Sequence, residues 1–286
     1  MLTAGLVHAA ERALPSLPGP LAPPIAEVIG SLAYAASPGA RAAVRANLRI
    51  VMPERHDRDM ARRVFVEQAR NYLEVFKVPR IPPARMRELV RKTGWEHFVR
   101  AAEQGRGVIV ASAHLGPISV VGQILVAHGY PVVLPIEAER SEFQRAVNRA
   151  RRGMGLQLVP VETPLAVYRA LKDGKVFGLL ADRAITGVGE RVPFFGHDAL
   201  LPSAHVALAL RTGAPIIPAF TGRDGATLTA SFEPPLELAA TGDRDADVRE
   251  GVRRWARVLE HYVRSAPEQW TVFESVWKDD VGTRHG

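Results

Sequence analysis

Cysteine is absent from this chain of 286 residues. Its absence excludes a disulfide framework, a thiol nucleophile, and zinc or iron–sulfur sites with cysteine ligands. The chain also lacks a run of about 18 apolar residues that could cross a bilayer. Residues 1–36 are apolar, but Glu11, Arg12 and five prolines interrupt them, and they lack the basic start of a secretory signal. We expect a capping helical hairpin or a helix in the membrane interface, with the protein on the cytoplasmic side in either case.

Acidic residues are fewer than basic ones, 30 against 37, which gives a formal net charge of +7. Such an excess favours an anionic partner, such as nucleic acid, a phospholipid surface or a phosphorylated substrate. The basic residues are spread along the chain, and no recognisable nucleic-acid-binding module accompanies them. We therefore expect no nucleic-acid partner. The preference for arginine over lysine also fits a plain alternative, a GC-rich genome.

Two patterns of apolar residues divide the chain. Helical spacing dominates residues 1–100, and from Gly107 short apolar runs alternate with helical segments, as in α/β proteins. Strands are predicted at 108–112, 132–136, 156–160, 176–181, 215–220 and 227–232, and helices at 118–127, 141–152, 164–172, 204–211 and 245–265. We expect an α/β fold with a central mixed sheet flanked by helices. An N-terminal helical region, 1–100, and an α/β core, 101–286, would form one structural unit.

One histidine stands where such a sheet places its ligand site. His114 follows the apolar run 108–112 and precedes Gly116 and Pro117, which favour a tight turn into a helix. Ligand crevices of open α/β sheets lie at the carboxyl ends of the strands. The imidazole is therefore a candidate general base, and the backbone N–H groups of the turn could stabilise an oxyanion. A structural histidine is the alternative.

A second segment, residues 180–196, carries acidic groups that could orient such a base. It follows another apolar run and contains Asp182, Arg183 and Glu190. A carboxylate beside an imidazole fixes its tautomer and stabilises its protonated form. Asp182 and Arg183 could equally form a structural ion pair. His128, His197 and His205 show no consistent metal-ligand spacing with His114, so we interpret them as structural or surface residues and expect no metal site.

Five short blocks stand in order between residues 40 and 280. They are Ala-His-Leu-Gly-Pro-Ile-Ser at 113–119, Asn-Arg-Ala-Arg-Arg-Gly at 148–153, Ala-Asp-Arg at 181–183 through Phe-Phe-Gly at 194–196, Arg-Thr-Gly-Ala-Pro-Ile-Ile-Pro at 211–218, and Ala-Pro-Glu-Gln-Trp at 266–270. In order and spacing they resemble the lysophospholipid acyltransferase superfamily. Within it they are most similar to the branch of the bacterial lipid A lauroyl and myristoyl acyltransferases and the mycobacterial phosphatidylinositol mannoside acyltransferases. No single block is specific, but five in sequence are.

The resemblance implies transfer of a fatty acyl chain from acyl-CoA or an acyl carrier protein to a hydroxyl group of a membrane lipid or glycolipid. It also implies a place at the cytoplasmic face of the bacterial inner membrane, and no metal or bound cofactor. His114 would take the proton of the acceptor hydroxyl. Arg149 and Arg183 would bind substrate phosphate, although the first could also lie on a solvated helix face. Phe194 and Phe195 would be core residues or the floor of an acyl or substrate pocket.

The first block departs from the family pattern, in which Asp or Glu stands five residues after the histidine. Ser119 occupies that place here, and a hydroxyl supplies no charge to stabilise an imidazolium. Our first choice for a relocated carboxylate is Glu190, because the mannoside branch carries a glutamate in the same loop. Asp182 is the second choice, and Ser119 itself could hydrogen-bond the ring or the acceptor.

We expect His114 and Glu190 to face one groove beside a long apolar channel. The alternative is a catalytically degenerate lipid-binding or partner-binding protein that keeps the same fold. A serine hydrolase is a weaker interpretation, because the chain has no Gly-x-Ser-x-Gly nucleophile elbow.

Overall fold

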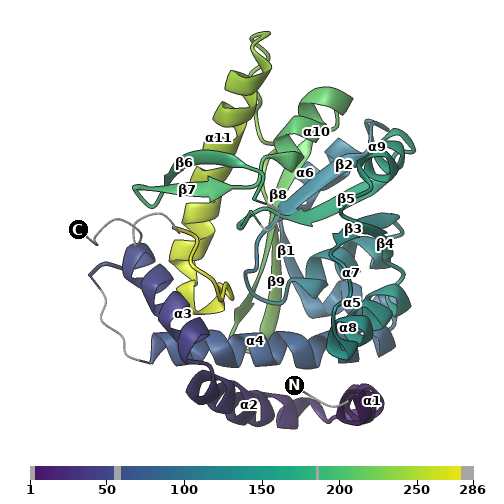
Figure 1. Ribbon diagram of the computed structural model, residues 1–286. Coiled ribbons are helices and arrows are strands. Elements are labelled where there is room, and N and C mark those ends of the chain that lie inside the picture. The colour runs from purple at the N-terminus through teal and green to yellow at the C-terminus, as the bar shows by residue number, and fades with distance from the viewer. Residues whose placement is uncertain (1–3, 55–58, 185–186, 278–286) are drawn as a thin grey trace, which may run out of the picture.

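Seven strands form the central sheet of the computed structural model, which describes residues 4–54, 59–184 and 187–277 (Figure 1). Across the sheet they are β1 (Val90–Thr93), β9 (Thr227–Phe232), β8 (Ile216–Asp224), β2 (Val108–Ser112), β5 (Val176–Leu180), β3 (Val132–Ile136) and β4 (Gln157–Pro160). Neighbouring strands run parallel except β8 and β9, which are antiparallel. The expectation of an α/β fold with a mixed sheet is confirmed.

Helices cover both faces of this sheet. On one face lie α5 (Pro83–Leu89), α6 (Trp95–Ala102), α7 (Ser119–Ala127) and α8 (Glu142–Gly153), and on the other α9 (Pro164–Lys172), α10 (Ala204–Thr212) and α11 (Arg244–Ser265). In β2, Val108 and Val110 join the core of the first face, whereas Ile109 and Ala111 join the core of the second. The apolar run is continuous because successive side chains of a central parallel strand are buried on alternate faces.

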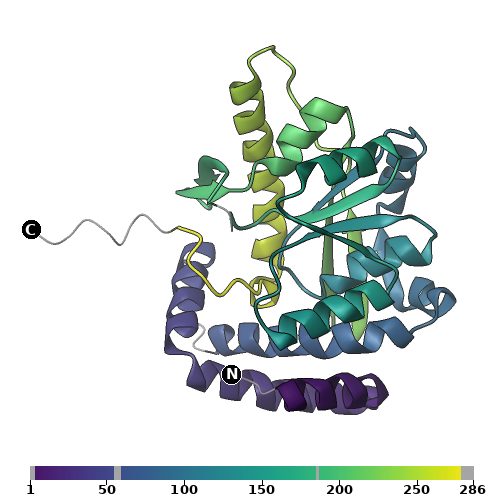
Figure 2. The same ribbon diagram turned by 45° about the vertical axis from the view of Figure 1, so that its right-hand side comes forward.

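Four helices form an N-terminal layer: α1 (Ala4–Ala13), α2 (Ala22–Ala36), α3 (Pro38–Val51) and α4 (Met60–Lys77). Figures 1 and 2 show α2 and α4 lying side by side beneath the sheet. Their backbones approach closely because Gly30 has no side chain, and a Cβ there would lie 2.4 Å from the Cα of Val66. Short 3-10 helices occupy Leu14–Ser16, Gly19–Leu21, Val78–Arg80 and Pro267–Gln269.

All six predicted strands are confirmed, but three others were missed. β1 is a short edge strand with the sequence Val-Arg-Lys-Thr, in the range where only helices were expected. β6 (Glu190–Phe194) and β7 (His197–Leu201) form a separate antiparallel hairpin in a range where no strand was predicted. The turn residues Phe195 and Gly196 have φ angles of 52° and 75°. Positive φ at both turn positions is the conformation that suits a tight hairpin.

His205 of α10 is a titratable group buried in this core. Its side chain is 0% exposed, and its ring packs against Trp255 at 5.4 Å between centroids. Within the described ranges, neither ring nitrogen has a hydrogen-bond partner. Burial lowers the pKa of His205 to about 3, because a charged ring there would lose its hydration without compensation.

We expect His205→Leu to reduce the acid sensitivity of the protein. Below pH 6.5 the unfolded chain binds a proton at His205, whereas the native chain does so only near pH 3. Between these values the group lowers the free energy of unfolding by about 1.4 kcal/mol per pH unit, and above them it contributes nothing. The free energies of unfolding are measured with urea at pH 7 and pH 5. The difference, variant minus wild type, should be about 2 kcal/mol larger at pH 5 than at pH 7. An unchanged difference would contradict an uncharged, buried His205.

Candidate active site

The parallel pairing of β2 and β5 determines where His114 lies. Ser112, the last residue of β2, is paired with Leu180, the last residue of β5. Ala181 N then donates to Ser112 O at 2.8 Å. His114 and Asp182 each follow two residues after the paired positions, so both leave the sheet at the same carboxyl-end edge. Adjacent strands are about 4.8 Å apart, and the two side chains can therefore meet.

Asp182 is completely buried and accepts three hydrogen bonds from N–H groups. His114 Nδ1 lies 2.8 Å from Oδ1, while His114 N and Trp270 Nε1 donate to Oδ2 at 2.9 Å and 3.0 Å. Burial by itself raises the pKa of Asp182, but the charge of the protonated His114 ring and these hydrogen bonds outweigh it. The resulting pKa lies below the ordinary value of an aspartate. Asp182 is therefore ionised at neutral pH.

The bond to Asp182 determines which nitrogen of His114 can act as a base. An ionised carboxylate only accepts hydrogen bonds, so Nδ1 carries the proton of the neutral ring. Nε2 then holds the lone pair, and no residue of the described ranges donates to it. The His114 side chain is 19% exposed. The arrangement can therefore take a proton from a hydroxyl group that reaches Nε2.

Residues 269–271 bind the backbone of the His114 loop. Thr271 N donates to His114 O at 2.7 Å, and Gly116 N donates to Gln269 O at 2.9 Å. The Gly116 N–H is therefore already used and cannot stabilise an oxyanion, contrary to what the sequence suggested for this turn.

A buried charge cluster joins this segment to the N-terminal layer. The Gln269 side chain bonds to both backbone groups of Arg223, accepting from N at 2.8 Å and donating to O at 3.0 Å. The Arg223 side chain is 3% exposed and donates to Glu67 and Glu74 of α4 at 2.5 to 3.3 Å. Removing one partner of such a buried cluster is costly. The segment that binds the His114 loop is therefore connected to α4 through Arg223.

The structure corrects our first choice of orienting carboxylate. Asp182, the second choice, occupies the position at His114 Nδ1. Glu190, the first choice, begins β6 and pairs instead with Arg249 of α11 at 3.2 Å. Ser119 is the first residue of α7, and its role in bonding the ring or the acceptor stays a prediction. Asp182 reaches Nδ1 because it follows β5 by the same two residues by which His114 follows β2.

Both arginines expected to bind phosphate are paired with carboxylates. Arg149 of α8 donates to Glu11 of α1 at 2.7 and 3.0 Å and to Glu142 at 2.9 Å, which raises the pKa of Arg149. This pairing joins α1 to α8 and is a structural role. Arg183 pairs with Glu274 at 3.3 Å, while its buried Nε has no partner in the described part of the chain. Phosphate binding by either arginine stays a prediction.

Phe194 is a core residue of this structure, in agreement with the first of the two alternatives. Its side chain is 0% exposed. It stacks on Trp277 with a centroid distance of 5.4 Å and meets the edge of Trp270 at 6.2 Å. A pocket role for Phe194 stays a prediction. Phe195 is partly exposed at the hairpin turn, and the Arg264 guanidinium lies 4.8 Å from its ring centroid. Its pocket role stays a prediction.

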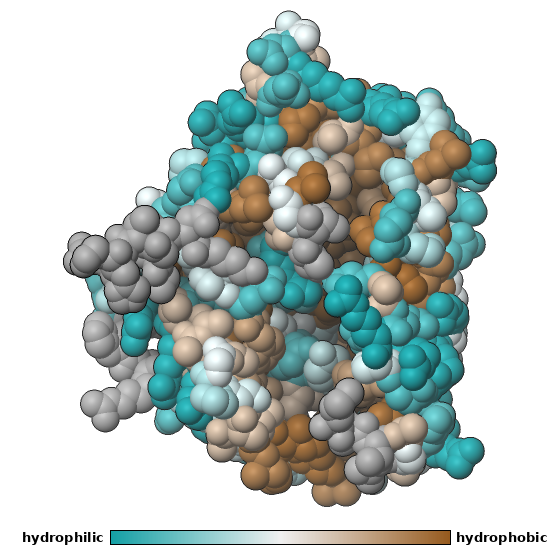
Figure 3. Space-filling model, in the orientation of Figure 1, coloured by the Kyte–Doolittle hydropathy of each residue, from teal (hydrophilic) through white to brown (hydrophobic). Residues whose placement is uncertain are grey.

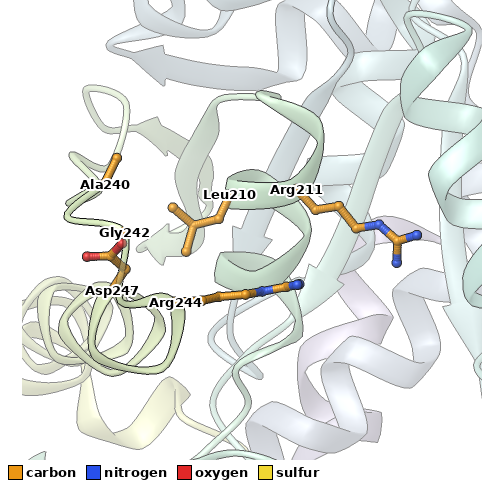
Figure 4. Close-up of a pocket in the computed structure, with 6 residues that line it drawn as sticks. All are labelled: Leu210, Arg211, Ala240, Gly242, Arg244 and Asp247. Atoms are coloured by element: carbon orange, nitrogen blue, oxygen red, sulfur yellow. The ribbon is translucent and has the colours of Figure 1, made fainter.

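Two pockets lie away from His114. A pocket of about 330 Å³ at the carboxyl ends of β3 and β4 is lined by Ile136, Glu137, Ala138, Glu139, Arg152, Pro160 and Glu162. A second, of about 340 Å³, lies between α10 and the start of α11 (Figure 4). There the Asp247 carboxylate points toward the Gly242 turn, and the Arg211 and Arg244 side chains both extend to the other side. Neither pocket is the expected apolar channel beside His114.

In the described ranges, no group of three or more His, Asp or Glu side chains is arranged so that it could bind a metal ion. The expectation of a site without metal or bound cofactor stays a prediction.

Sequence reasoning did not assign a role to Trp270, although its block contributed to the resemblance. A tryptophan after a long helix is a common core residue, and nothing in the spacing relates it to a carboxylate 88 positions earlier. Sequence reasoning also gave no role to Arg223 and Gln269, because their contacts depend on how α4 packs against the segment after α11.

Sequence comparisons identify the family of the chain and several relatives. Residues 2–279 match a family described as bacterial lipid A biosynthesis acyltransferase. The chain is 27% identical over 257 residues to the phosphatidylinositol mannoside acyltransferase of Mycolicibacterium smegmatis, covering 87% of this chain and 83% of that protein. It is 28% identical over 221 residues to the Mycobacterium tuberculosis protein of the same name, covering 74% and 68%.

We expect Asp182→Asn to reverse the tautomer of His114. Two N–H groups donate to Oδ2, so the amide oxygen should take that position and its NH₂ group should face Nδ1. Nδ1 must then accept, and the proton of the neutral ring moves to Nε2. Long-range ¹H–¹⁵N spectra at neutral pH measure this directly. Glu190→Gln is the control and should leave the wild-type tautomer. A ring that stays protonated at Nδ1 in Asp182→Asn would contradict the assignment.

Proposed function

Because this chain belongs to the bacterial lipid A biosynthesis acyltransferase family, we propose that it uses a thioester donor, acyl-CoA or acyl carrier protein, and His114 as general base. Family membership makes the chain an acyltransferase that acts on a lipid or glycolipid acceptor. The observation that carries the proposal is the bond from His114 Nδ1 to the buried Asp182, which leaves Nε2 as the basic nitrogen. The relatives are named for phosphatidylinositol mannoside, so a mannose-bearing phospholipid is the first acceptor to test.

In the proposed reaction, His114 Nε2 takes the proton of the acceptor hydroxyl while the hydroxyl oxygen attacks the thioester carbonyl. The C–S bond then breaks, and the imidazolium gives its proton to the leaving sulfur. The products are an ester and a free thiol. Asp182 stays ionised and stabilises the imidazolium. The amino end of α7, which begins at Ser119, supplies partial positive charge for the developing oxyanion.

The serine at position 119 does not favour the degenerate alternative. Asp182 supplies, from the adjacent strand, the negative charge that Ser119 cannot. A protein kept only for lipid binding would not require a buried, ionised carboxylate bonded to a solvent-accessible imidazole. Burying an ionised carboxylate costs free energy. In catalysis this carboxylate orients the base and stabilises its protonated form.

Membrane attachment through α2 is the second part of the proposal. Leu21, just before α2, and Val28, Ile29 and Leu32 on it are between 46% and 65% exposed. Their helical spacing places them on one side, and Figure 3 shows apolar surface at the lower edge, where Figure 1 has α2. Among the described helices none is long and apolar enough to cross a membrane. We propose that this side of α2 lies in the membrane interface at the cytoplasmic face, where thioester donors are made.

Acyl transfer should depend on His114 and Asp182. We expect His114→Ala and Asp182→Asn each to lower kcat by roughly a thousandfold, since one removes the base and the other gives it the wrong tautomer. The assay follows a labelled long-chain acyl group from acyl-CoA, and separately from acyl carrier protein, into a membrane lipid extract.

Two further variants serve as controls in that assay. Glu190→Gln should change kcat by less than about threefold, because Glu190 pairs with Arg249 instead. Ser119→Asp should give no large gain, because Nδ1 is already occupied. A large gain from Ser119→Asp together with little loss from Asp182→Asn would refute the assigned pair.

Charge on the exposed side of α2 should release the protein from lipid. We expect Val28→Glu with Leu32→Glu to weaken flotation with phosphatidylcholine–phosphatidylglycerol vesicles by roughly tenfold or more, because burying a leucine or valine side chain stabilises binding by about 1.5–3 kcal/mol. Leu165→Glu is the matched control, since Leu165 is 58% exposed on α9, in a different part of the fold. Equal flotation of all three proteins would rule out attachment through α2.

A further inference from the structure

Trp270 contacts the His114–Asp182 pair at the buried carboxylate. Its side chain is 2% exposed, and its indole Nε1 donates to Asp182 Oδ2 at 3.0 Å. The same oxygen accepts the backbone N–H of His114, while Oδ1 is left for Nδ1. The indole therefore completes the set of donors that assigns each carboxylate oxygen its partner.

The position of the indole is determined by the backbone that carries it. Trp270 forms an antiparallel bridge with Leu115, the residue after His114, and Thr271 N donates to His114 O at 2.7 Å. The ring is also held by aromatic contacts with Phe194 and Trp277 at 6.2 and 6.3 Å. The base and the donor to its carboxylate are thus fixed to each other by main-chain pairing.

The physical effect of this donor is on the carboxylate. A buried carboxylate keeps its charge only when hydrogen bonds replace its lost hydration. Without the indole, Oδ2 keeps only the hydrogen bond from His114 N, so the carboxylate is held less firmly about its last side-chain torsion. The Asp182 carboxylate is also less stabilised as an anion, so it attracts the proton on His114 Nδ1 more strongly. Both effects would act on the His114 ring through Asp182.

We infer that Trp270 is a positioning residue of the acyl transfer proposed above: its indole N–H holds the Asp182 carboxylate in the orientation that fixes the His114 ring. It acts through Asp182 and does not contact the acceptor or the donor. The inference rests on the proposed function for its catalytic meaning, and on the geometry of Trp270, Asp182 and His114 for the interaction itself.

Trp277 provides a matched comparison within the same aromatic cluster. Its side chain is 4% exposed, and its indole Nε1 donates to Phe194 O at 3.1 Å. Replacing either tryptophan by phenylalanine removes one buried indole donor and a similar apolar area. Only Trp270→Phe removes a donor to a charged group, so only that variant should affect the base.

The test compares wild type, Trp270→Phe and Trp277→Phe in the pH dependence of acyl transfer. For Trp270→Phe we expect kcat to fall by roughly tenfold or more, as for loss of a hydrogen bond to a charged acceptor. KM should stay within about threefold, and the acidic limb of the kcat/KM profile should move to higher pH by about half a unit or more. Trp277→Phe should keep the wild-type limb. Equal profiles for the two variants would overturn the inference.

A second measurement keeps the inference separate from the proposed function. The pH titration of the His114 ring protons is followed by NMR in wild type and in protein with benzothienylalanine at position 270, which keeps the indole shape but lacks the N–H. We expect the midpoint to move to higher pH with the analogue and to stay in place when Trp277 is replaced in the same way. A moved midpoint without acyl transfer by any of these proteins would refute the proposed function and leave only the effect of the indole N–H on the His114–Asp182 pair. An unmoved midpoint would refute the inference, whatever the transfer assay gives.

Discussion

The burial of one ionised carboxylate, Asp182, is the constraint on which the rest of the site depends. A charge at that depth persists only where N–H groups replace the water it has lost. Those groups come from the loop after β2, which carries His114, and from the segment after α11, which carries Trp270. The sheet, the loop and the last segment must therefore be in place together before the base has its orientation.

The same constraint connects the site to the N-terminal layer. Gln269 precedes Trp270 and bonds to the backbone of Arg223, whose guanidinium is buried against Glu67 and Glu74 of α4. α4 in turn packs closely along α2 through Gly30. If α2 lies in the membrane interface as proposed, the orientation of the protein on the lipid also sets the direction from which an acceptor hydroxyl reaches His114.

Most of the sheet could be predicted from the sequence because its central strands are buried on both faces. Residues 108–112 and 132–136 are uninterrupted runs whose ends the structure confirms without change. β1 and the β6–β7 hairpin could not be predicted in this way. β1 is a charged edge strand, and in β6 the buried Val192 and Phe194 alternate with the exposed Arg191 and Pro193, so neither has the apolar run that marks a central strand.

The sequence by itself determined that His114 stands at the carboxyl end of a core strand, and the ordered blocks determined the family. It could not determine which carboxylate meets the imidazole, because Asp182 is 68 positions away. The family pattern was no guide either, since Ser119 stands at the usual acidic position. That pairing depends on β5 lying beside β2 with Ser112 opposite Leu180. Strand order and register follow from the packing of all the helices on both faces, which local spacing does not encode, and so only the tertiary structure decided it.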